Sequence, residues 1–442
     1  MSGVGFTRAD FPENFVFGTA TSAYQIEGTQ FGGCGESHWD TFAATPGNVE
    51  RAEDGAVACG HYNTWESDLD LIAKGGFDAY RFSMNWARVM PDGQTINPEG
   101  LDFYDRLVDG MLARGIRPYA TLYHWDLPSA LADKGGWRNR DVASWFADYT
   151  EATMSRIGDR VEATATINEP WCVAWLSHFI GGHAPGMRDI RAAARAMHHV
   201  LLAHGRSIEV MRGLGLSNLG IVTNLEGSQP VDDRPETIAA HQRNHALYNE
   251  WFLSGVFKGE YPKAAMEGLE PHLPQGWQDD FPTIQAKVDW LGINYYTRKR
   301  ICNSGGPWPQ IGEAPGPLEK TSFGWEIEPD RLRHFLTWAA SEYSGDLPIY
   351  VTENGMAGHD YLLDEKCPDP QRVKYLRDHF DAAKQAIAQG VPLKGYFVWS
   401  LMDNYEWAAG YDKRFGLVHV DFDTLARTPK DSWYAMRDAL TG

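Results

Sequence analysis

The stretch VEATATINEP, residues 161–170, decides the fold class of this chain. Its first seven residues are mostly small or β-branched, as in a buried strand, and the polar pair Asn168-Glu169 follows them directly. The stretch PIYVTENG, residues 348–355, repeats the pattern and places Glu353 after a second such run. Buried strands that end in polar groups are typical of a parallel α/β sheet, in which the chemistry gathers at the carboxyl ends of the strands.

Outward from these two stretches, the chain alternates short apolar runs with segments of helical spacing. This alternation predicts parallel strands joined by crossover helices, and eight strands predict closure into a (β/α)8 TIM barrel. No repeat or flexible linker divides the chain, so we expect one catalytic domain over residues 1–442. The expected strands are 15–22, 79–83, 117–122, 161–167, 220–223, 288–293, 348–352 and 395–400. The expected helices are 62–74, 101–114, 142–157, 192–211, 237–253, 331–341 and 371–389.

The composition is that of a folded, acidic protein. Hydrophobic residues make up 43% and charged residues 22%, which supplies a large core and excludes intrinsic disorder. Lysine and arginine number 40 against 59 aspartates and glutamates, so the net charge is −19. This charge repels phosphate backbones and anionic lipid surfaces, so we expect neither nucleic acid nor a membrane as a partner.

The chain carries no sign of export. Residues 1–18 include three charged side chains and no uninterrupted apolar region, so we expect no secretory signal, and no run of 18 apolar residues indicates a membrane span. The five cysteines are scattered, odd in number and without a C-x-x-C pair, which argues against both a disulfide framework and a zinc cluster. We therefore expect the protein in the reducing cytoplasm.

Several histidines are spaced by about one helical turn and raise the question of a metal site. Their segments lack the closely set carboxylates of a helical metal site. We expect these histidines to be hydrogen-bonded or to face solvent, and we expect neither a metal nor a cofactor. They are His198, His199, His204, His241 and His245.

Nearly every expected strand ends in a side chain that can hydrogen-bond, carry charge or stack on a ring. At the mouth of a barrel such groups suit a polar ligand with flat faces, such as a sugar. The 17 Trp, 19 Tyr and 20 Phe of the chain could line such a site as well as fill a core. The strand-end residues are Gln25, Arg81, His124, Trp125, Asn168, Glu169, Asn224, Asn294, Tyr296, Glu353, Asn354 and Trp399.

Two of these residues, Glu169 and Glu353, end the fourth and the seventh expected strands. Strands in these positions can face each other across the mouth of a barrel, although the two residues are far apart in sequence. Paired carboxylates surrounded by amides and aromatic platforms are what glycoside hydrolysis requires, because one group must act as an acid and the other as an anion.

The motifs around these glutamates resemble glycoside hydrolase family 1, the β-glucosidase family. The glutamates lie in Asn168-Glu169-Pro170 and in Thr352-Glu353-Asn354-Gly355, which are similar to the paired signatures of that family. The resemblance runs nearly from end to end. Its other stretches are FVFGTATSAYQIEG at 15–28, YRFS at 80–83, YHWDLP at 123–128, WSLMDNYEW at 399–407 and KRFGL at 413–417.

The resemblance implies a retaining β-glycosidase, in first place a β-glucosidase, that hydrolyses terminal β-D-glucosyl residues through a covalent glycosyl-enzyme. Its partners would be small-molecule β-glycosides and short oligosaccharides, as in the degradation of cellulose and other polysaccharides. Glu353 is then the nucleophile, and Glu169 is the general acid that later serves as base. Arg81 and Tyr296 support the nucleophile, and we expect them to lower its pKa.

The same resemblance implies the residues that hold the substrate. Trp399 is the platform under the sugar ring, and a non-proline cis peptide bond between Trp399 and Ser400 aims its indole. The implied substrate-binding residues are Gln25, His124, Trp125, Asn168, Asn294, Tyr296, Trp399, Glu406 and Trp407. Three bulky residues after the acid, Trp171, Trp175 and Leu176, predict a narrow, apolar entrance for the aglycone.

Several alternatives stay open at this point. Glu406 disfavours the phospho-sugar branch of the family, because a carboxylate would repel a phosphate, and Glu169 disfavours the thioglucosidase branch. A sugar-binding barrel that has lost its chemistry is the alternative outside enzymes, and both glutamates argue against it. The sequence does not separate hydrolysis from transglycosylation, nor glucose from galactose or fucose, and it does not indicate the oligomeric state.

Overall fold

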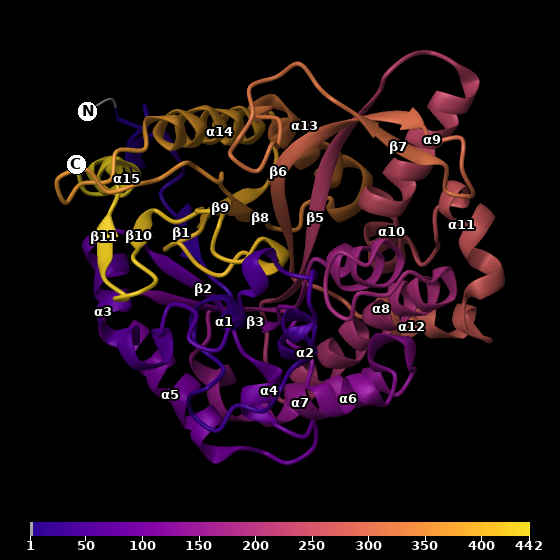
Figure 1. Ribbon diagram of the computed structural model, residues 1–442, viewed down its shortest axis with the longest axis horizontal. Coiled ribbons are helices and arrows are strands. Elements are labelled where there is room, and N and C mark those ends of the chain that lie inside the picture. The colour runs from indigo at the N-terminus through magenta and orange to yellow at the C-terminus, as the bar shows by residue number, and fades with distance from the viewer. Residues whose placement is uncertain (1–2) are drawn as a thin grey trace.

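Eight parallel strands close into a barrel in the computed structural model, which describes residues 3–442 (Figure 1). They are β1 (Val16–Ala20), β2 (Ala79–Ser83), β3 (Arg117–Tyr123), β4 (Ala163–Asn168), β5 (Leu219–Pro230), β6 (Trp290–Asn303), β8 (Ile349–Asn354) and β9 (Leu393–Trp399). Strand β1 pairs with β2 and β9, and β5 pairs with β6 to close the circle. The predicted (β/α)8 fold is confirmed. Met1 and Ser2 of the expected domain 1–442 lie outside the described residues.

Helices surround the barrel, as Figure 1 shows. The longer ones are α3 (His61–Lys74), α5 (Pro98–Ala113), α7 (Val142–Ile157), α8 (Ile190–Gly213), α9 (Pro235–His245), α10 (Trp251–Lys258), α13 (Pro329–Ala339), α14 (Pro370–Ala388) and α15 (Asp431–Thr441). The shorter ones are α1 (Ala23–Ile26), α2 (His38–Ala44), α4 (Trp86–Val89), α6 (Ser129–Asp133), α11 (Lys263–Leu269) and α12 (Phe281–Ile284). The helix expected over 237–253 is divided, because a π-helical turn at Ala246–Glu250 joins α9 to α10. Among residues 3–442, no helix has both the length and the apolar character needed to cross a membrane.

Strands β5 and β6 continue well past the predicted runs 220–223 and 288–293. Their outer halves remain paired with each other as far as Pro230, and β7 (Ile311–Ala314) joins β6 antiparallel (Figure 1). In the sequence these halves resemble loops, because they carry charged residues. In the structure only some of their side chains are buried, as expected where strands extend beyond the barrel core. The extension raises one wall above the mouth of the barrel. A small hairpin, β10 (Val418–Val420) and β11 (Arg427–Pro429), follows the last barrel strand.

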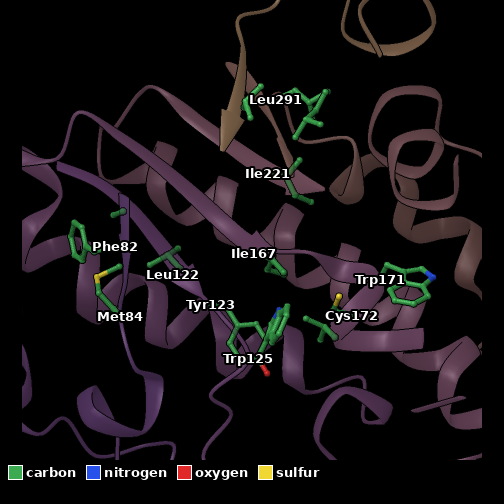
Figure 2. Packing of buried hydrophobic residues seen from close by; sticks show 14 of the residues in the cluster. Phe82, Met84, Leu122, Tyr123, Trp125, Ile167, Trp171, Cys172, Ile221 and Leu291 are labelled. Atoms are coloured by element: carbon green, nitrogen blue, oxygen red, sulfur yellow. The ribbon is translucent and has the colours of Figure 1, made fainter. Parts of the chain in front are cut away.

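Alternate side chains of the barrel strands belong to two different cores. Outward-facing residues of successive strands pack beneath the helices. Figure 2 labels five of them, Phe82, Leu122, Ile167, Ile221 and Leu291. Inside the barrel, Tyr119 packs on Phe397 with 4.9 Å between ring centroids, and Trp290 packs on Tyr350 at 5.6 Å. Because Phe82 points outward, its neighbour Arg81 points into the barrel.

The inner core requires a glycine at position 18 of β1. The Phe397 ring lies directly against Gly18, and a Cβ atom there would come within 2.3 Å of Phe397 Cδ1. Tyr119 packs on the same ring, so the ring cannot move away without displacing a second aromatic residue. The absence of a side chain at Gly18 therefore makes the space that Phe397 fills.

We expect Gly18→Ala to lower the free energy of unfolding by about 1–3 kcal/mol, the usual cost of overpacking a filled core. Thermal or urea unfolding followed by tryptophan fluorescence measures the change. Gly213→Ala is the matched control, because Gly213 ends α8 and an added Cβ would meet no atom within 4 Å. Equal unfolding midpoints for the two variants would contradict this account of the core.

Candidate active site

The carboxyl ends of the strands surround a cavity of about 490 Å³. The fold brings both predicted carboxyl groups to it, since Glu169 follows β4 and Glu353 lies near the end of β8. The predicted residues in its lining are His124, Trp125, Glu169, Trp171, Leu176, Asn224, Tyr296, Glu353, Trp399, Glu406 and Trp407. The predicted residues Gln25, Arg81, Asn168 and Asn294 stand behind this lining and hydrogen-bond to it or to one another.

Glu353 is held by a charged donor and a neutral one. Arg81 Nη1 lies 2.6 Å from Glu353 Oε1, and the Tyr296 hydroxyl donates to Oε2 over 2.7 Å. The Arg81 side chain is only 2% exposed, and its Nη2 donates to Asn168 Oδ1 over 2.7 Å. One guanidinium thus connects Glu353 to the residue that precedes Glu169.

Glu169 is held by neutral donors. It lies just beyond β4 with a left-handed backbone (φ 50°), and its amide donates to the Val222 carbonyl of β5 over 2.9 Å. Asn294 Nδ2 donates to Oε1 over 2.7 Å, and the Cys172 thiol donates to Oε2 over 3.2 Å. Both direct donors leave the charge of the carboxyl group uncompensated.

Burial raises the pKa of both carboxyl groups. The side chains around each group then make the two pKa values different. At Glu353, the charge and hydrogen bond of Arg81 and the hydrogen bond from Tyr296 oppose burial. At Glu169, the negative charge of Glu353 adds to burial and raises the pKa to about 8. Arg81 and Tyr296 lower the Glu353 pKa, as expected, but burial has the larger effect and the net shift is upward. Since the guanidinium faces Glu353, the negative charge resides there and the proton on Glu169.

The predicted hydrogen-bonding residues for a sugar lie in the lining of the cavity or directly behind it. Gln25 Nε2 lies 3.5 Å from Glu406 Oε2, and Asn168 Nδ2 lies 3.2 Å from His124 Nε2. Burial lowers the His124 pKa well below its ordinary value, so the imidazole is neutral. Burial and the two other carboxyl groups raise the Glu406 pKa to about 8. The cavity therefore offers both donors and acceptors to hydroxyl groups.

Tryptophans form the walls around these polar groups. Trp399 stacks on His124 with 5.7 Å between ring centroids, and Trp125 lies 4.6 Å from Trp407. The predicted cis bond between Trp399 and Ser400 is confirmed. Trp125 and Trp407 share the left-handed backbone of Glu169, with φ of 84° and 50°. Such conformations persist where the surroundings hold them, and they are concentrated at functional sites.

The predicted entrance residues divide into two groups. Trp171 and Leu176 line the cavity, whereas Trp175 lies outside the lining and stacks on Phe179 at 4.1 Å. Both Trp175 and Leu176 lie in the π-helical segment Cys172–Ile180, which directly follows Trp171.

Two charged residues that sequence reasoning missed line the cavity, Glu226 of β5 and Lys299 of β6. Lys299 Nζ lies 3.4 Å from Glu226 Oε2 and 2.6 Å from Glu313 Oε1. Burial raises the Glu226 pKa to about 7 despite the opposing charge of Lys299. Strand alternation was the available signal, since Glu226 follows Asn224 by two residues and shares its face. The entrance has a charged side as well as an apolar one.

The helical histidines are hydrogen-bonded individually. His198 Nε2 lies 2.8 Å from Asp280 Oδ2, and His204 Nδ1 lies 2.7 Å from the Thr166 hydroxyl. In the described part of the chain, no three or more His, Cys, Asp or Glu side chains are grouped so that they could hold a metal ion.

A parallel barrel with two buried carboxyl groups among hydroxyl-binding and aromatic side chains defines a glycoside hydrolase. The chain belongs to glycosyl hydrolase family 1, whose sequence pattern matches residues 7–441. It is 45% identical to Beta-glucosidase A of Thermotoga maritima over 432 residues, which are 96% of this chain and 97% of that relative. It is 46% identical to the Beta-glucosidase of an Agrobacterium species over 437 residues, 97% and 95% of the two chains.

Solved structures agree with this membership. The family 1 b-glucosidase from Thermotoga maritima superposes with a TM-score of 0.94 at 44% identity and covers 97% of this chain and 98% of that one. The Thermotoga maritima enzyme has also been solved in complex with deoxynojirimycin and with glucoimidazole.

We expect Tyr296→Phe to lower kcat/KM by roughly 10- to 100-fold, the cost of removing a hydrogen bond to a charged group. The lost hydroxyl stabilises the ionised form of Glu353, so the Glu353 pKa rises and the acid limb of the pH profile moves to higher pH. The profile of kcat/KM with an aryl β-glucoside measures this. Tyr295→Phe is the control, because the Tyr295 hydroxyl donates to the Glu328 carbonyl instead. An acid limb that stays in place would count against this support of Glu353.

Proposed function

We propose that this protein is a retaining β-glucosidase in which Glu353 is the nucleophile and Glu169 the general acid and base. The observation that carries the proposal is the contrast between two carboxyl groups of one cavity. Glu353 is held by the buried Arg81 guanidinium, whereas Glu169 is held by neutral donors and has a pKa of about 8. The first suits an anion and the second a proton donor.

The reaction takes two steps. In the first, the Glu353 carboxylate attacks the anomeric carbon while Glu169 protonates the glycosidic oxygen, so the bond to the aglycone breaks and a glycosyl-enzyme ester forms. The charge of Glu353 is then consumed in the ester, so the Glu169 pKa falls. In the second step, Glu169 takes a proton from water, whose oxygen attacks the anomeric carbon and releases Glu353.

We assign sugar recognition to the polar and aromatic residues around the two carboxyl groups. Gln25 and Glu406 take the outer hydroxyls, and Trp399 is the platform beneath the ring. Asn168 takes the 2-hydroxyl, where hydrogen bonds strengthen in the transition state. Arg81 orients Asn168 Oδ1, which leaves its amide directed toward His124 and the cavity. The remaining residues assigned to substrate binding are His124, Trp125, Asn294, Tyr296 and Trp407.

The substrates we propose are small-molecule β-glycosides and short oligosaccharides. A relative from Thermotoga neapolitana, named 1,4-beta-D-glucan glucohydrolase and 44% identical over 432 residues, supports β-1,4-glucan fragments among them. We also infer that the chain acts as one catalytic domain, supported by the hydrogen bond from Arg8 near its start to the Leu440 carbonyl near its end. The five free cysteines support a cytoplasmic location.

Glu353→Ala tests the nucleophile. We expect kcat to fall by roughly 10⁴-fold or more, because the covalent step loses its attacking group. Added azide should restore part of the turnover and give a glycosyl azide of inverted configuration, because it attacks in place of the carboxylate. Activity with an aryl β-glucoside and NMR of the product measure both effects. Parental activity in the purified variant would remove Glu353 from this role.

Glu169→Ala tests the acid. We expect kcat/KM to fall by about 10²- to 10⁴-fold with cellobiose, whose leaving group needs a proton. With 2,4-dinitrophenyl β-glucoside the loss should be far smaller, because that leaving group departs unprotonated. Glu162→Ala, a substitution at the exposed residue just before β4, is the control. Losses of equal size on both substrates would be incompatible with acid catalysis by Glu169.

A further inference from the structure

Cys172 has a place in the cavity that the reaction described above leaves unexplained. It is 7% exposed, lines the cavity and begins the π-helical segment after Glu169. Its amide donates to the Glu169 carbonyl over 2.9 Å, and this tight turn returns its side chain to the Glu169 carboxyl group. Ser177 Oγ donates to the Cys172 carbonyl over 2.7 Å and fixes the turn from the other side. Cys172 and Trp171 are both labelled in Figure 2.

The thiol contacts Glu169 from the side opposite Asn294. Cys172 Sγ lies 3.2 Å from Glu169 Oε2, whereas Asn294 Nδ2 donates a hydrogen bond to Oε1 over 2.7 Å. Asn224 Nδ2 lies 3.6 Å from the same sulfur and donates to it, which leaves the S–H bond free to point at Glu169. Each carboxyl oxygen of Glu169 therefore has one neutral donor, and the two donors come from different elements.

The sulfur is present as a thiol. Burial, followed by the negative charge of Glu169, raises the Cys172 pKa well above its ordinary value. A protonated thiol is a weak hydrogen-bond donor, whereas a thiolate would repel the carboxylate. The surroundings thus keep Cys172 in the one form that can donate to Glu169, and this form is a poor nucleophile.

We infer that Cys172 is a positioning residue for the acid and base Glu169, holding its carboxyl group, together with Asn294, in the orientation from which it transfers protons. The inference rests on the role proposed for Glu169 above. Because a donor on a carboxyl oxygen favours the ionised form, the thiol also lowers the Glu169 pKa. Without it, Glu169 would hold its proton more tightly and turn more freely.

Other charged and titratable groups lie close to Glu169 or to Cys172 and also influence the Glu169 pKa. They come from β2, β5, β6, β8, the turn between α9 and α10 and the loop after β9. They are Arg81, Glu226, Tyr296, Glu353, Tyr248 and Glu406. None of them is a direct hydrogen-bond partner of the Glu169 carboxyl group, so substitution of Cys172 removes its contacts to Glu169 and Asn224 without removing a charge.

The test compares donors and volumes at position 172 in the full-length enzyme. Cys172→Ala and Cys172→Val both remove the donor, and they leave different side-chain volumes, whereas Cys172→Ser keeps a donor. Each variant is assayed for kcat and KM with cellobiose and with 2,4-dinitrophenyl β-glucoside across pH. Cys367→Ala is the matched control, because Cys367 is a buried cysteine (1% exposed) outside the cavity lining.

We expect Cys172→Ala and Cys172→Val to lose roughly three- to tenfold in kcat/KM with cellobiose and less than about twofold with the dinitrophenyl substrate. Their alkaline limb with cellobiose should move to higher pH, since the Glu169 pKa rises. With the dinitrophenyl substrate kcat and KM should fall together, because base catalysis of the second step slows and the glycosyl-enzyme accumulates. Cys172→Ser and Cys367→Ala should stay within about twofold of the parent.

Equal losses in kcat/KM on both substrates, or Cys172→Ser as slow as Cys172→Ala, would show that the thiol only fills space and would overturn the inference. If Cys172→Ala does not fold, Cys172→Val and Cys172→Ser give the same comparison. Glu169→Ala, assayed alongside, distinguishes failure of the role inferred for Cys172 from failure of the role proposed for Glu169. If it discriminates between the substrates while the Cys172 variants do not, only the role of Cys172 fails. If Glu169→Ala itself does not discriminate, the acid assignment fails.

Discussion

The buried ion pair between Arg81 and Glu353 is the constraint on which the rest of the site depends. Taking these two charges out of water costs several kcal/mol for each ion, and only close contacts return that energy. Arg81 obtains them by spanning the barrel from β2 to Glu353 on β8 and to Asn168 on β4. Side chains alternate along β2, and Phe82 points outward into the core beneath the helices, so the neighbouring Arg81 side chain points into the barrel. The register of three strands is thus tied to one guanidinium, and removing it would leave Glu353 as an uncompensated buried charge.

That ion pair also explains how two identical side chains acquire different roles in one cavity. Both glutamates are buried, and burial alone would protonate both. The guanidinium makes Glu353 the site of the negative charge, and this charge in turn raises the pKa of Glu169. The left-handed backbone of Glu169 lets its carboxyl group enter the cavity directly after β4. The Trp125 indole donates to the Asn168 carbonyl over 3.0 Å, so the wall of the cavity also supports this turn. Geometry and electrostatics are therefore set by the same few contacts.

The sequence was sufficient for the barrel and for both carboxyl groups because local patterns encode them. A buried run followed by a polar residue and a breaker, as at Glu169 and at Glu353, places a side chain at the mouth of the barrel whatever the details of packing. Side-chain direction beyond the barrel is not encoded in this way. Trp175 and Leu176 lie in the π-helical segment Cys172–Ile180, a rare geometry that no motif in the sequence indicates, so the sequence could not show which of the two lines the cavity. Glu226 was missed because its charge made a strand resemble a loop. The lowering effect of Arg81 and Tyr296 on the Glu353 pKa could be predicted, but the opposing effect of burial could not, because burial is known only from the structure.

The two ends of the cavity differ in how far short sequence motifs determine them. The inner end is built from strand ends and one ion pair, so its residues are fixed by the barrel and can be recognised from short motifs. The outer end is built from Trp171 and Leu176 on one side and from the extension of β5 and β6 on the other. The extension carries the pair Glu226 and Lys299, whose charges lie among aromatic rings and are only partly balanced by each other. Recognition of the sugar that is cleaved therefore follows from the fold, whereas selection of the group that leaves follows from segments whose conformation the fold does not dictate. One barrel can in this way keep its chemistry while its entrance changes.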